Sequence, residues 1–167
     1  MTKRSAAILS TIFFFIAPGT VVGIIPWWLC RWHLSPPLLG LPALRYLGGL
    51  LLVAGLAVLV DSFLQFVIRG SGTPAPVAPP KTLVISGFYR YVRNPMYVAF
   101  VSAIAGQGLL FGSRRVLIYA AGAWLTTHLF VCLYEEPHLR AQFGEQYDAF
   151  VRHVPRWIPR LTPWTGD

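Results

Sequence analysis

Four long apolar stretches, separated by shorter polar segments, dominate the pattern of this chain. They cover residues 6–29, 42–67, 96–111 and 116–134. A helix needs about 20 apolar residues to cross the hydrocarbon core of a bilayer, so the pattern predicts about four transmembrane helices. The third stretch is short, and we expect its helix to begin near Asn94 and Pro95, at the level of the lipid headgroups.

The remaining segments predict a connector and a tail helix. Residues 70–80 (GSGTPAPVAPP) contain four prolines, which exclude a regular helix and favour an extended connector. After the fourth stretch, apolar residues recur at the spacing of an amphipathic helix; they are Leu139, Phe143, Tyr147, Phe150 and Val151. The expected fold class is an all-α, polytopic membrane helical bundle of about four transmembrane helices plus this C-terminal amphipathic helix.

The composition favours lipid over water as the surroundings of this bundle. Hydrophobic residues make up 55% of the 167 residues and charged residues only 12%, whereas soluble domains carry about 25% charged residues. The formal net charge is +8, but the basic residues lie between the apolar stretches, which favours anionic membrane surfaces over nucleic acid. We therefore expect membrane lipids as partners and no nucleic acid.

The distribution of Lys and Arg predicts the orientation of the bundle, because cytoplasmic loops carry more of them. With the N-terminus inside, ten of the 14 basic residues lie on the cytoplasmic side and four on the other. This predicts an integral protein of the inner (cytoplasmic) membrane, with both termini and the amphipathic tail helix in the cytoplasm. The first stretch is longer than the apolar core of a signal peptide, so we expect it to be a retained helix. Cys30 and Cys132 fall near opposite faces of the membrane and are expected to be free, buried thiols.

Residues 87–97 form a polar and aromatic group at the start of the third predicted helix. They contain two arginines, an asparagine and three tyrosines. Asn94 can cap a helix whose first residue is Pro95, and a helix N-terminus beside arginines favours an anion. The same composition is typical of a positively charged membrane anchor with an aromatic belt. The residues alone leave both interpretations open.

Two further motifs contain residues that are costly or unusual in a membrane protein. Glu135 and Glu136 directly follow the fourth stretch. Adjacent carboxylates repel each other, so we expect a cation beside them, unless they only complement the dipole of the tail helix. Gly106-Gln107-Gly108 lies inside the third stretch, where glycines can bring helices together or let a ligand approach the backbone. The sequence has no zinc-ligand spacing and predicts no metal site.

Together, these polar groups resemble the integral-membrane methyltransferases, a superfamily that includes isoprenylcysteine carboxyl methyltransferases and phospholipid N-methyltransferases. Residues 86–97 (SGFYRYVRNPMY) resemble the start of the catalytic region of that superfamily. The tail resembles the other half of the pattern, with EEP at 135–137, FGEQY at 143–147 and VPRWIP at 154–159. The resemblance covers residues 81–160, and the two motifs stand in the superfamily's order.

The resemblance implies that the bundle binds S-adenosylmethionine at the cytoplasmic surface and methylates a lipophilic, lipid-like small molecule. It assigns to the cofactor pocket Tyr89, Arg90, Arg93, Asn94, Tyr97, Gly106, Gly108, Glu135 and Glu136. Residues 1–80 then supply two N-terminal transmembrane helices and the proline-rich connector. Residues 81–167 form the catalytic methyltransferase region, with two transmembrane helices and the C-terminal tail. Arginine suits the carboxylate of the cofactor, and glutamate suits its amine or ribose.

The acceptor is expected to reach the pocket from the bilayer, between the third and fourth predicted helices. Arg152 and His153 follow the tail helix and are the catalytic cations expected to meet a polar acceptor group there. Isoprenylcysteine carboxyl methyltransferases have a basic residue, often Arg, at the position of His153. A carboxylate favours such a permanent cation, so amine and thiol acceptors stay open. The expected enzyme is isoprenylcysteine carboxyl methyltransferase-like, with a phospholipid N-methyltransferase-like enzyme as the alternative.

The non-enzymatic alternatives are a small four-helix transporter and a structural membrane protein. A transporter is expected to carry ionisable residues near the bilayer midplane, whereas Asp61 and His128 lie away from it. His128 is expected instead to be an internal hydrogen-bond partner. The intact Arg93, Asn94 and glutamate pair disfavour a purely structural role.

The orientation can be tested with topology reporters. A reporter fused after Ser113 should give an exterior signal, whereas fusions at Gly72 and Asp167 should give cytoplasmic signals, because most basic residues flank the latter two. A cytoplasmic signal at Ser113 would overturn the orientation and place both polar motifs on the exterior face.

Overall fold

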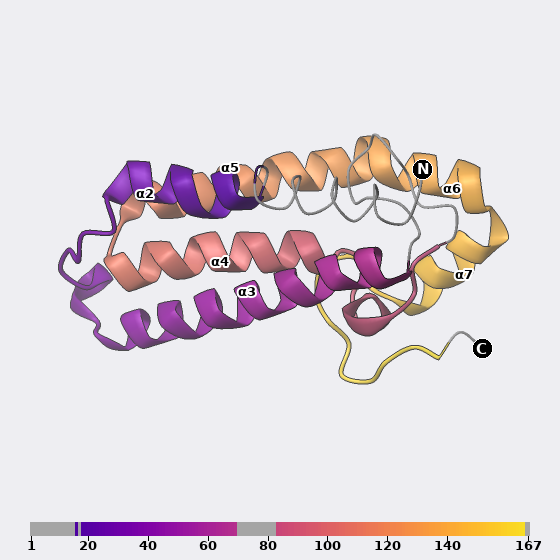
Figure 1. Cartoon of the computed structure of the whole chain (residues 1–167), viewed down its shortest axis with the longest axis horizontal. Helices are drawn as coiled ribbons and strands as arrows, with labels where there is room; N and C mark the ends of the chain where they lie inside the picture. The colour runs from indigo at the N-terminus through magenta and orange to yellow at the C-terminus, as the bar shows by residue number, and fades with distance from the viewer. Residues whose placement is uncertain (1–15, 17, 70–82, 166–167) are drawn as a thin grey trace.

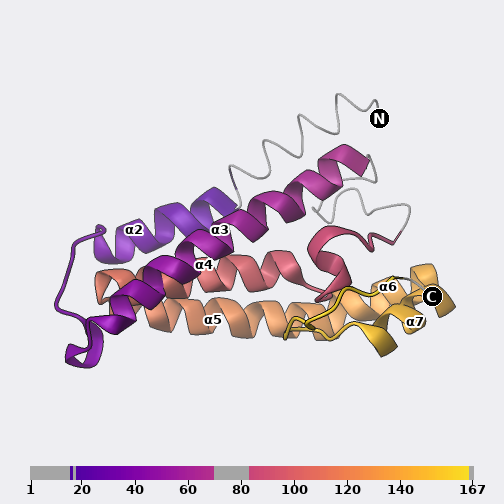
Figure 2. The ribbon, with the colours of Figure 1, turned by 90° about the horizontal axis from the view of Figure 1, so that it is seen from below.

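The computed structural model describes residue 16 and residues 18–69 and 83–165 of the chain. Every regular element in these residues is a helix, as the apolar pattern predicts. In chain order they are η1 (Gly19–Ile24), α2 (Ile25–Cys30), η2 (Leu38–Gly40), α3 (Ala43–Arg69), η3 (Gly87–Arg90), α4 (Pro95–Phe111), α5 (Arg114–Phe130), η4 (Val131–Glu135), α6 (Glu136–Phe143) and α7 (Glu145–His153). They form an elongated bundle with α6 and α7 at one end (Figure 1, Figure 2).

The helices follow the apolar stretches closely. α3 covers the second stretch, α4 begins at Pro95 and ends at Phe111, and α5 with η4 covers the fourth. Two helical segments are long and apolar enough to cross a membrane, Ala43–Ser62 and Arg114–Phe143, whereas Gly19–Cys30 and Pro95–Phe111 are apolar but shorter. The described residues thus contain two candidate spans, and four spans stay a prediction. Most of the first stretch and the whole connector at residues 70–80 lie outside the described residues.

Glycines let α3 and α4 pack with their backbones almost in contact. A Cβ atom on Gly48 would lie 2.7 Å from the carbonyl oxygen of Gly106, and one on Gly55 would lie 2.6 Å from that of Ala99. The buried cluster around this contact contains Val22, Leu59, Ala99, Ala103, Ile104, Val116 and Ala120. Gly106 therefore serves helix packing, one of the two interpretations that the sequence leaves open.

A buried amide attaches the N-terminal helices to α4. Nε2 of Gln107 donates to the carbonyl oxygen of Val22 at 2.7 Å, and its Oε1 accepts from Nε1 of Trp32 at 3.0 Å. The Tyr119 hydroxyl of α5 donates to the carbonyl oxygen of Val21 at 3.0 Å. Because buried polar groups need partners, these bonds fix η1 and α2 against α4 and α5.

The tail is divided into two helices. Gly144, with φ 51° and ψ −127°, separates α6 from α7 in a conformation that favours glycine. α7 buries Tyr147 and Phe150, which cluster with Val154. The apolar face of α7 thus packs on the protein itself.

Two smaller expectations can be compared with the structure. Cys30 and Cys132 are free thiols, as expected, but they are half-buried rather than buried. His128 is an internal hydrogen-bond partner, because its Nδ1 accepts from Nε1 of Trp157 at 3.1 Å.

The close approach of α3 to α4 predicts the effect of adding one methyl group. In Gly106→Ala the new Cβ atom would lie 2.6 Å from the backbone nitrogen of Leu52, so we expect a loss of about 1–3 kcal/mol of stability in thermal unfolding in detergent. Gly122→Ala is the matched control, because nothing lies within 4 Å of its Cβ position. If Gly106→Ala unfolds at the wild-type temperature, this helix packing is contradicted.

Candidate active site

The polar group at residues 87–97 folds as η3 and the first turn of α4. Asn94 is the N-cap residue and Pro95 the first residue of α4, as the sequence predicts. The Asn94 side chain does not cap the helix; its Nδ2 donates to the carbonyl oxygen of Arg156 at 3.2 Å. Asn94 therefore joins the start of α4 to the C-terminal segment that follows α7 (residues 155–164).

Glu136 lies between two guanidinium groups. Its Oε1 is 2.9 Å from Nη1 of Arg93, and its two oxygens accept from Nε and Nη2 of Arg156 at 2.6 and 2.9 Å. Such a bidentate pair is among the stronger hydrogen-bonded contacts in proteins, and it raises the pKa of Arg156 above its usual range. The cation expected beside the glutamate pair is therefore present, and there are two of them.

Glu135 has a different environment from its neighbour. The Tyr97 hydroxyl donates to Oε2 of Glu135 at 2.9 Å, and within the described residues Glu135 has no ion-pair partner. Burial, followed by the negative charges of Glu135 and Asp61, raises the pKa of the Tyr89 phenol, so Tyr89 stays protonated. Glu136 is thus neutralised by cations, whereas Glu135 accepts a hydrogen bond from Tyr97 and has no counter-charge among the described residues.

The C-terminal segment, residues 155–164, runs alongside the arginine motif. The backbone N–H of Arg93 donates to the carbonyl oxygen of Pro155, and that of Trp164 donates to the carbonyl oxygen of Arg90, both at 2.9 Å. Nε of Arg90 donates back to the carbonyl oxygen of Trp164 at 2.7 Å. Residues 90–94 are therefore held by this segment as well as by Glu136.

Most of the residues predicted for the cofactor pocket gather at this end of the bundle; they are Tyr89, Arg90, Arg93, Asn94, Tyr97, Glu135 and Glu136. The two glycines lie elsewhere. Gly106 is nine residues beyond Tyr97, or about 14 Å along the helix. A Cβ atom on Gly108 would lie 2.5 Å from Cδ2 of Leu117 in α5, so this glycine also serves packing.

Arg152 and His153 are both exposed at the end of α7. The His153 ring stacks on Trp164 with centroids 5.3 Å apart, and its Nδ1 lies 2.8 Å from the carbonyl oxygen of Ala149. In the part of the chain that the structure describes, no ion pair links either side chain to the glutamates. Their contact with an acceptor stays a prediction.

Sequence reasoning missed three residues of this region: Arg156, Trp157 and Trp164. Arg156 stands inside the VPRWIP motif, and the glutamates' need for a cation indicates an arginine of the tail without distinguishing Arg156 from the others. Trp157 attaches the C-terminal segment to His128 of α5. Trp164 stacks on Phe150 with centroids 5.9 Å apart, and nothing in the sequence indicates this role.

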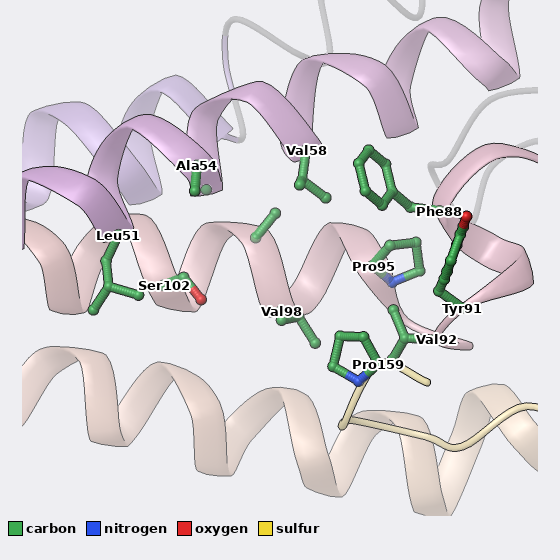
Figure 3. A pocket seen from close by; sticks show the side chains of 12 residues that line it. Leu51, Ala54, Val58, Phe88, Tyr91, Val92, Pro95, Val98, Ser102 and Pro159 are labelled. Atoms are coloured by element: carbon green, nitrogen blue, oxygen red, sulfur yellow. The ribbon is translucent and has the colours of Figure 1, made fainter. Parts of the chain in front are cut away.

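Two cavities flank α4 near the cluster. One, of about 220 Å³, lies between α4 and α5 and is lined by Tyr97, Val98, Val101, Ser102, Trp124, Thr127 and Trp157. The other, of about 240 Å³, is a groove between α3, α4 and η3 with almost wholly apolar side chains (Figure 3). Tyr97 connects the first cavity to Glu135, so a polar ligand fits there better than in the apolar groove.

Comparison with known proteins identifies the family. Residues 44–146, more than half of the chain, match the sequence profile of the phospholipid methyltransferase family. The chain therefore belongs to this family, which confirms the resemblance seen in the two polar motifs. The matched region contains Arg93, Glu135 and Glu136, and membership implies a methyl donor.

Individual relatives match about half of this chain. Protein-S-isoprenylcysteine O-methyltransferase of Schizosaccharomyces pombe is 35% identical over 86 residues, which cover 47% of this chain and 34% of the relative. Cobalt-zinc-cadmium resistance protein CzcN of Cupriavidus metallidurans is 33% identical over 86 residues, which cover 52% of this chain and 39% of the relative. Phosphatidylethanolamine N-methyltransferase of Paracoccidioides brasiliensis is 32% identical over 80 residues, which cover 46% of this chain and 8% of the relative. The match thus spans well under half the length of each relative.

Proposed function

We propose that this chain is an integral-membrane methyltransferase that uses S-adenosylmethionine and methylates a lipophilic acceptor at the cytoplasmic face of the membrane. Membership of the phospholipid methyltransferase family supports the class of reaction. Two relatives are methyltransferases named for an isoprenylcysteine and for phosphatidylethanolamine, which supports a lipophilic acceptor. The observation that carries the proposal is the separation of charge around Glu135 and Glu136.

This separation of charge fits the amino-acid end of S-adenosylmethionine, which carries a carboxylate and an ammonium group. Arg93 and Arg156 together exceed the single charge of Glu136. Nε of the buried Arg93 has no hydrogen-bond partner, whereas its Nη1 is paired with Glu136 at 2.9 Å. The Nε donor suits the carboxylate, and Glu135, which has no counter-charge among the described residues, suits the ammonium group or the ribose hydroxyls.

The residues around the cluster favour positioning and exclusion of water. When bound, S-adenosylmethionine supplies an electrophilic methyl group on a sulfonium, and its transfer depends on orientation and a dry site more than on acid–base groups. Tyr97 holds the Glu135 carboxylate in place. The cavity between α4 and α5 is lined by Tyr97, Trp124 and Trp157, so it is linked to Glu135 through the Tyr97 hydroxyl.

The proposal includes the arrangement of the chain in the membrane. Residues 81–167 act as the catalytic region, and residues 1–80 supply two further membrane helices and the connector. Both termini lie in the cytoplasm, as the distribution of Lys and Arg favours. Gly106 and Gly108 support the site through helix packing.

Cofactor affinity tests this proposal. Glu135→Gln and Arg93→Ala should each weaken S-adenosylmethionine binding about tenfold or more, because a hydrogen bond to a charged group contributes about 1.5–3 kcal/mol. Isothermal titration calorimetry on the full chain in detergent measures this. Glu145→Gln, the same acid-to-amide change at an exposed position of α7, is the matched control and should bind as the wild type does.

The two possible failures have different meanings. A folded wild-type chain that does not bind S-adenosylmethionine contradicts the proposed function. Wild-type affinity in both Glu135→Gln and Arg93→Ala leaves the cofactor in place but contradicts its assignment to this charge cluster.

A further inference from the structure

Two of the most exposed apolar side chains among the described residues belong to the C-terminal segment. Ile158 is 78% exposed and Leu161 is 98% exposed, and both lie in irregular backbone rather than on a helix. Single exposed apolar residues are common on proteins, but these two lie within two residues of Arg156 and Arg160. Apolar residues beside basic ones are typical of a segment at the boundary between lipid headgroups and lipid chains.

The residue before Ile158 packs at the depth of the apolar helices. Nε1 of Trp157 donates to Nδ1 of His128 at 3.1 Å. His128 lies within the membrane-length segment Arg114–Phe143, about 10 Å before Glu135 along the helix. From the charge cluster, the C-terminal segment therefore reaches back alongside the apolar part of the bundle.

The residue after Ile158 packs at a similar depth on another helix. Pro159 lines the apolar groove together with Val58 of α3 (Figure 3), and Val58 belongs to the other membrane-length segment, Ala43–Ser62. Ile158 thus stands between two residues, Trp157 and Pro159, that both line cavities beside α4. Because its own side chain is exposed at this depth, its surroundings are lipid rather than water.

Polar groups of the segment are bonded to the protein, as irregular backbone at membrane depth requires. The backbone N–H of Arg160 donates to the carbonyl oxygen of Tyr91 at 2.9 Å, and the carbonyl oxygen of Arg156 accepts from Nδ2 of Asn94 at 3.2 Å. Nη1 of Arg160 donates to the carbonyl oxygen of His153 at 2.9 Å. These polar groups face η3, α4 and α7, while the apolar side chains of the segment stay uncovered.

We propose that Ile158 and Leu161 insert into the bilayer and that this lipid contact holds the C-terminal segment in place. Because Arg156 belongs to the same segment, the bilayer then helps to keep its guanidinium against Glu136. The depth of the neighbouring contacts favours lipid over a second protein as the occupant. This contact needs neither the cofactor nor the acceptor, so it stands apart from the proposed function.

Spin labels measure whether the two side chains lie in lipid. In the full chain in phosphatidylcholine nanodiscs, with Cys30 and Cys132 replaced by alanine, one nitroxide is attached to Ile158→Cys or to Leu161→Cys. Both labels should collide more often with oxygen than with a water-soluble nickel complex, because oxygen concentrates in the lipid. Electron paramagnetic resonance power saturation gives the two collision rates.

Two further labels calibrate the measurement. Leu125→Cys, at an exposed position within the membrane-length segment of α5, gives the lipid value, and Glu145→Cys, exposed on α7, gives the water value. A water-like ratio at both Ile158 and Leu161 overturns the proposal. Low collision rates with both reagents also overturn it, because they show that protein covers the side chains.

The unmodified chain provides an independent measurement that needs no cysteine variant. In nanodiscs whose lipids carry a photoactivatable group on the acyl chain, crosslinks located by mass spectrometry should include residues 157–161. Crosslinks to the exposed face of α5 without any to residues 157–161 contradict the insertion.

Hydrogen–deuterium exchange tests whether lipid contact holds the segment. In the double variant Ile158→Ser, Leu161→Ser, the amide of Arg160, which donates to Tyr91, should exchange several-fold faster in nanodiscs than in the wild type, because the segment opens more often. Ile118→Ser, a matched change at a 72% exposed position of α5, should leave this amide unchanged. Wild-type exchange in the double variant overturns the proposal that the bilayer holds this segment.

Discussion

The buried carboxylate of Glu136 is the interaction on which the candidate site depends. It receives one guanidinium from Arg93, just before α4, and another from Arg156 in the C-terminal segment, while Glu136 itself begins α6. Removing a carboxylate from water costs several kcal/mol unless it is paired and hydrogen-bonded. Because the two arginines meet that requirement, one side chain joins three segments that are far apart in the sequence.

Apolar packing decides where this charged cluster lies. Gly48, Gly55 and Gly106 bring the backbones of α3 and α4 together, so that the end of α3 arrives beside η3 and the start of α4. Charged side chains are costly within the hydrocarbon layer, and the glutamates lie where η4 meets α6, at the end of the bundle that carries α6 and α7 (Figure 2). At such a boundary a water-soluble methyl donor and a bilayer lipid can reach the same site.

The sequence predicts the helices well because long apolar stretches and the Asn94-Pro95 boundary are local signals. It also predicts that a cation accompanies the glutamates, since that follows from charge alone. It does not identify Arg156 as one of the two cations, because several arginines in the tail satisfy the same requirement. Small residues within a helix suit both packing and ligand approach, so the sequence cannot predict that Leu52 and Leu117 lie beside Gly106 and Gly108.

The break in the tail at Gly144 is a further difference from the sequence pattern. Apolar positions on both sides of Gly144 keep a helical spacing, and the pattern therefore gives no sign of the change in backbone direction between α6 and α7. That change turns Tyr147 and Phe150 towards Trp164 and the protein core. Arg152 and His153 are exposed at the end of α7, and the cation that the tail contributes to the cluster is Arg156.

The most direct test compares one chemical change at two ion pairs. The Glu136 side chain is 11% exposed in its pairs with Arg93 and Arg156, whereas the Asp148 side chain is 42% exposed in its pair with Arg140. Thermal unfolding in detergent should show Glu136→Gln to be less stable by about 3–5 kcal/mol, because it leaves the buried Arg93 guanidinium without a counter-charge. Asp148→Asn should cost less than about 1 kcal/mol. Equal and small losses in the two variants would contradict the central role of Glu136.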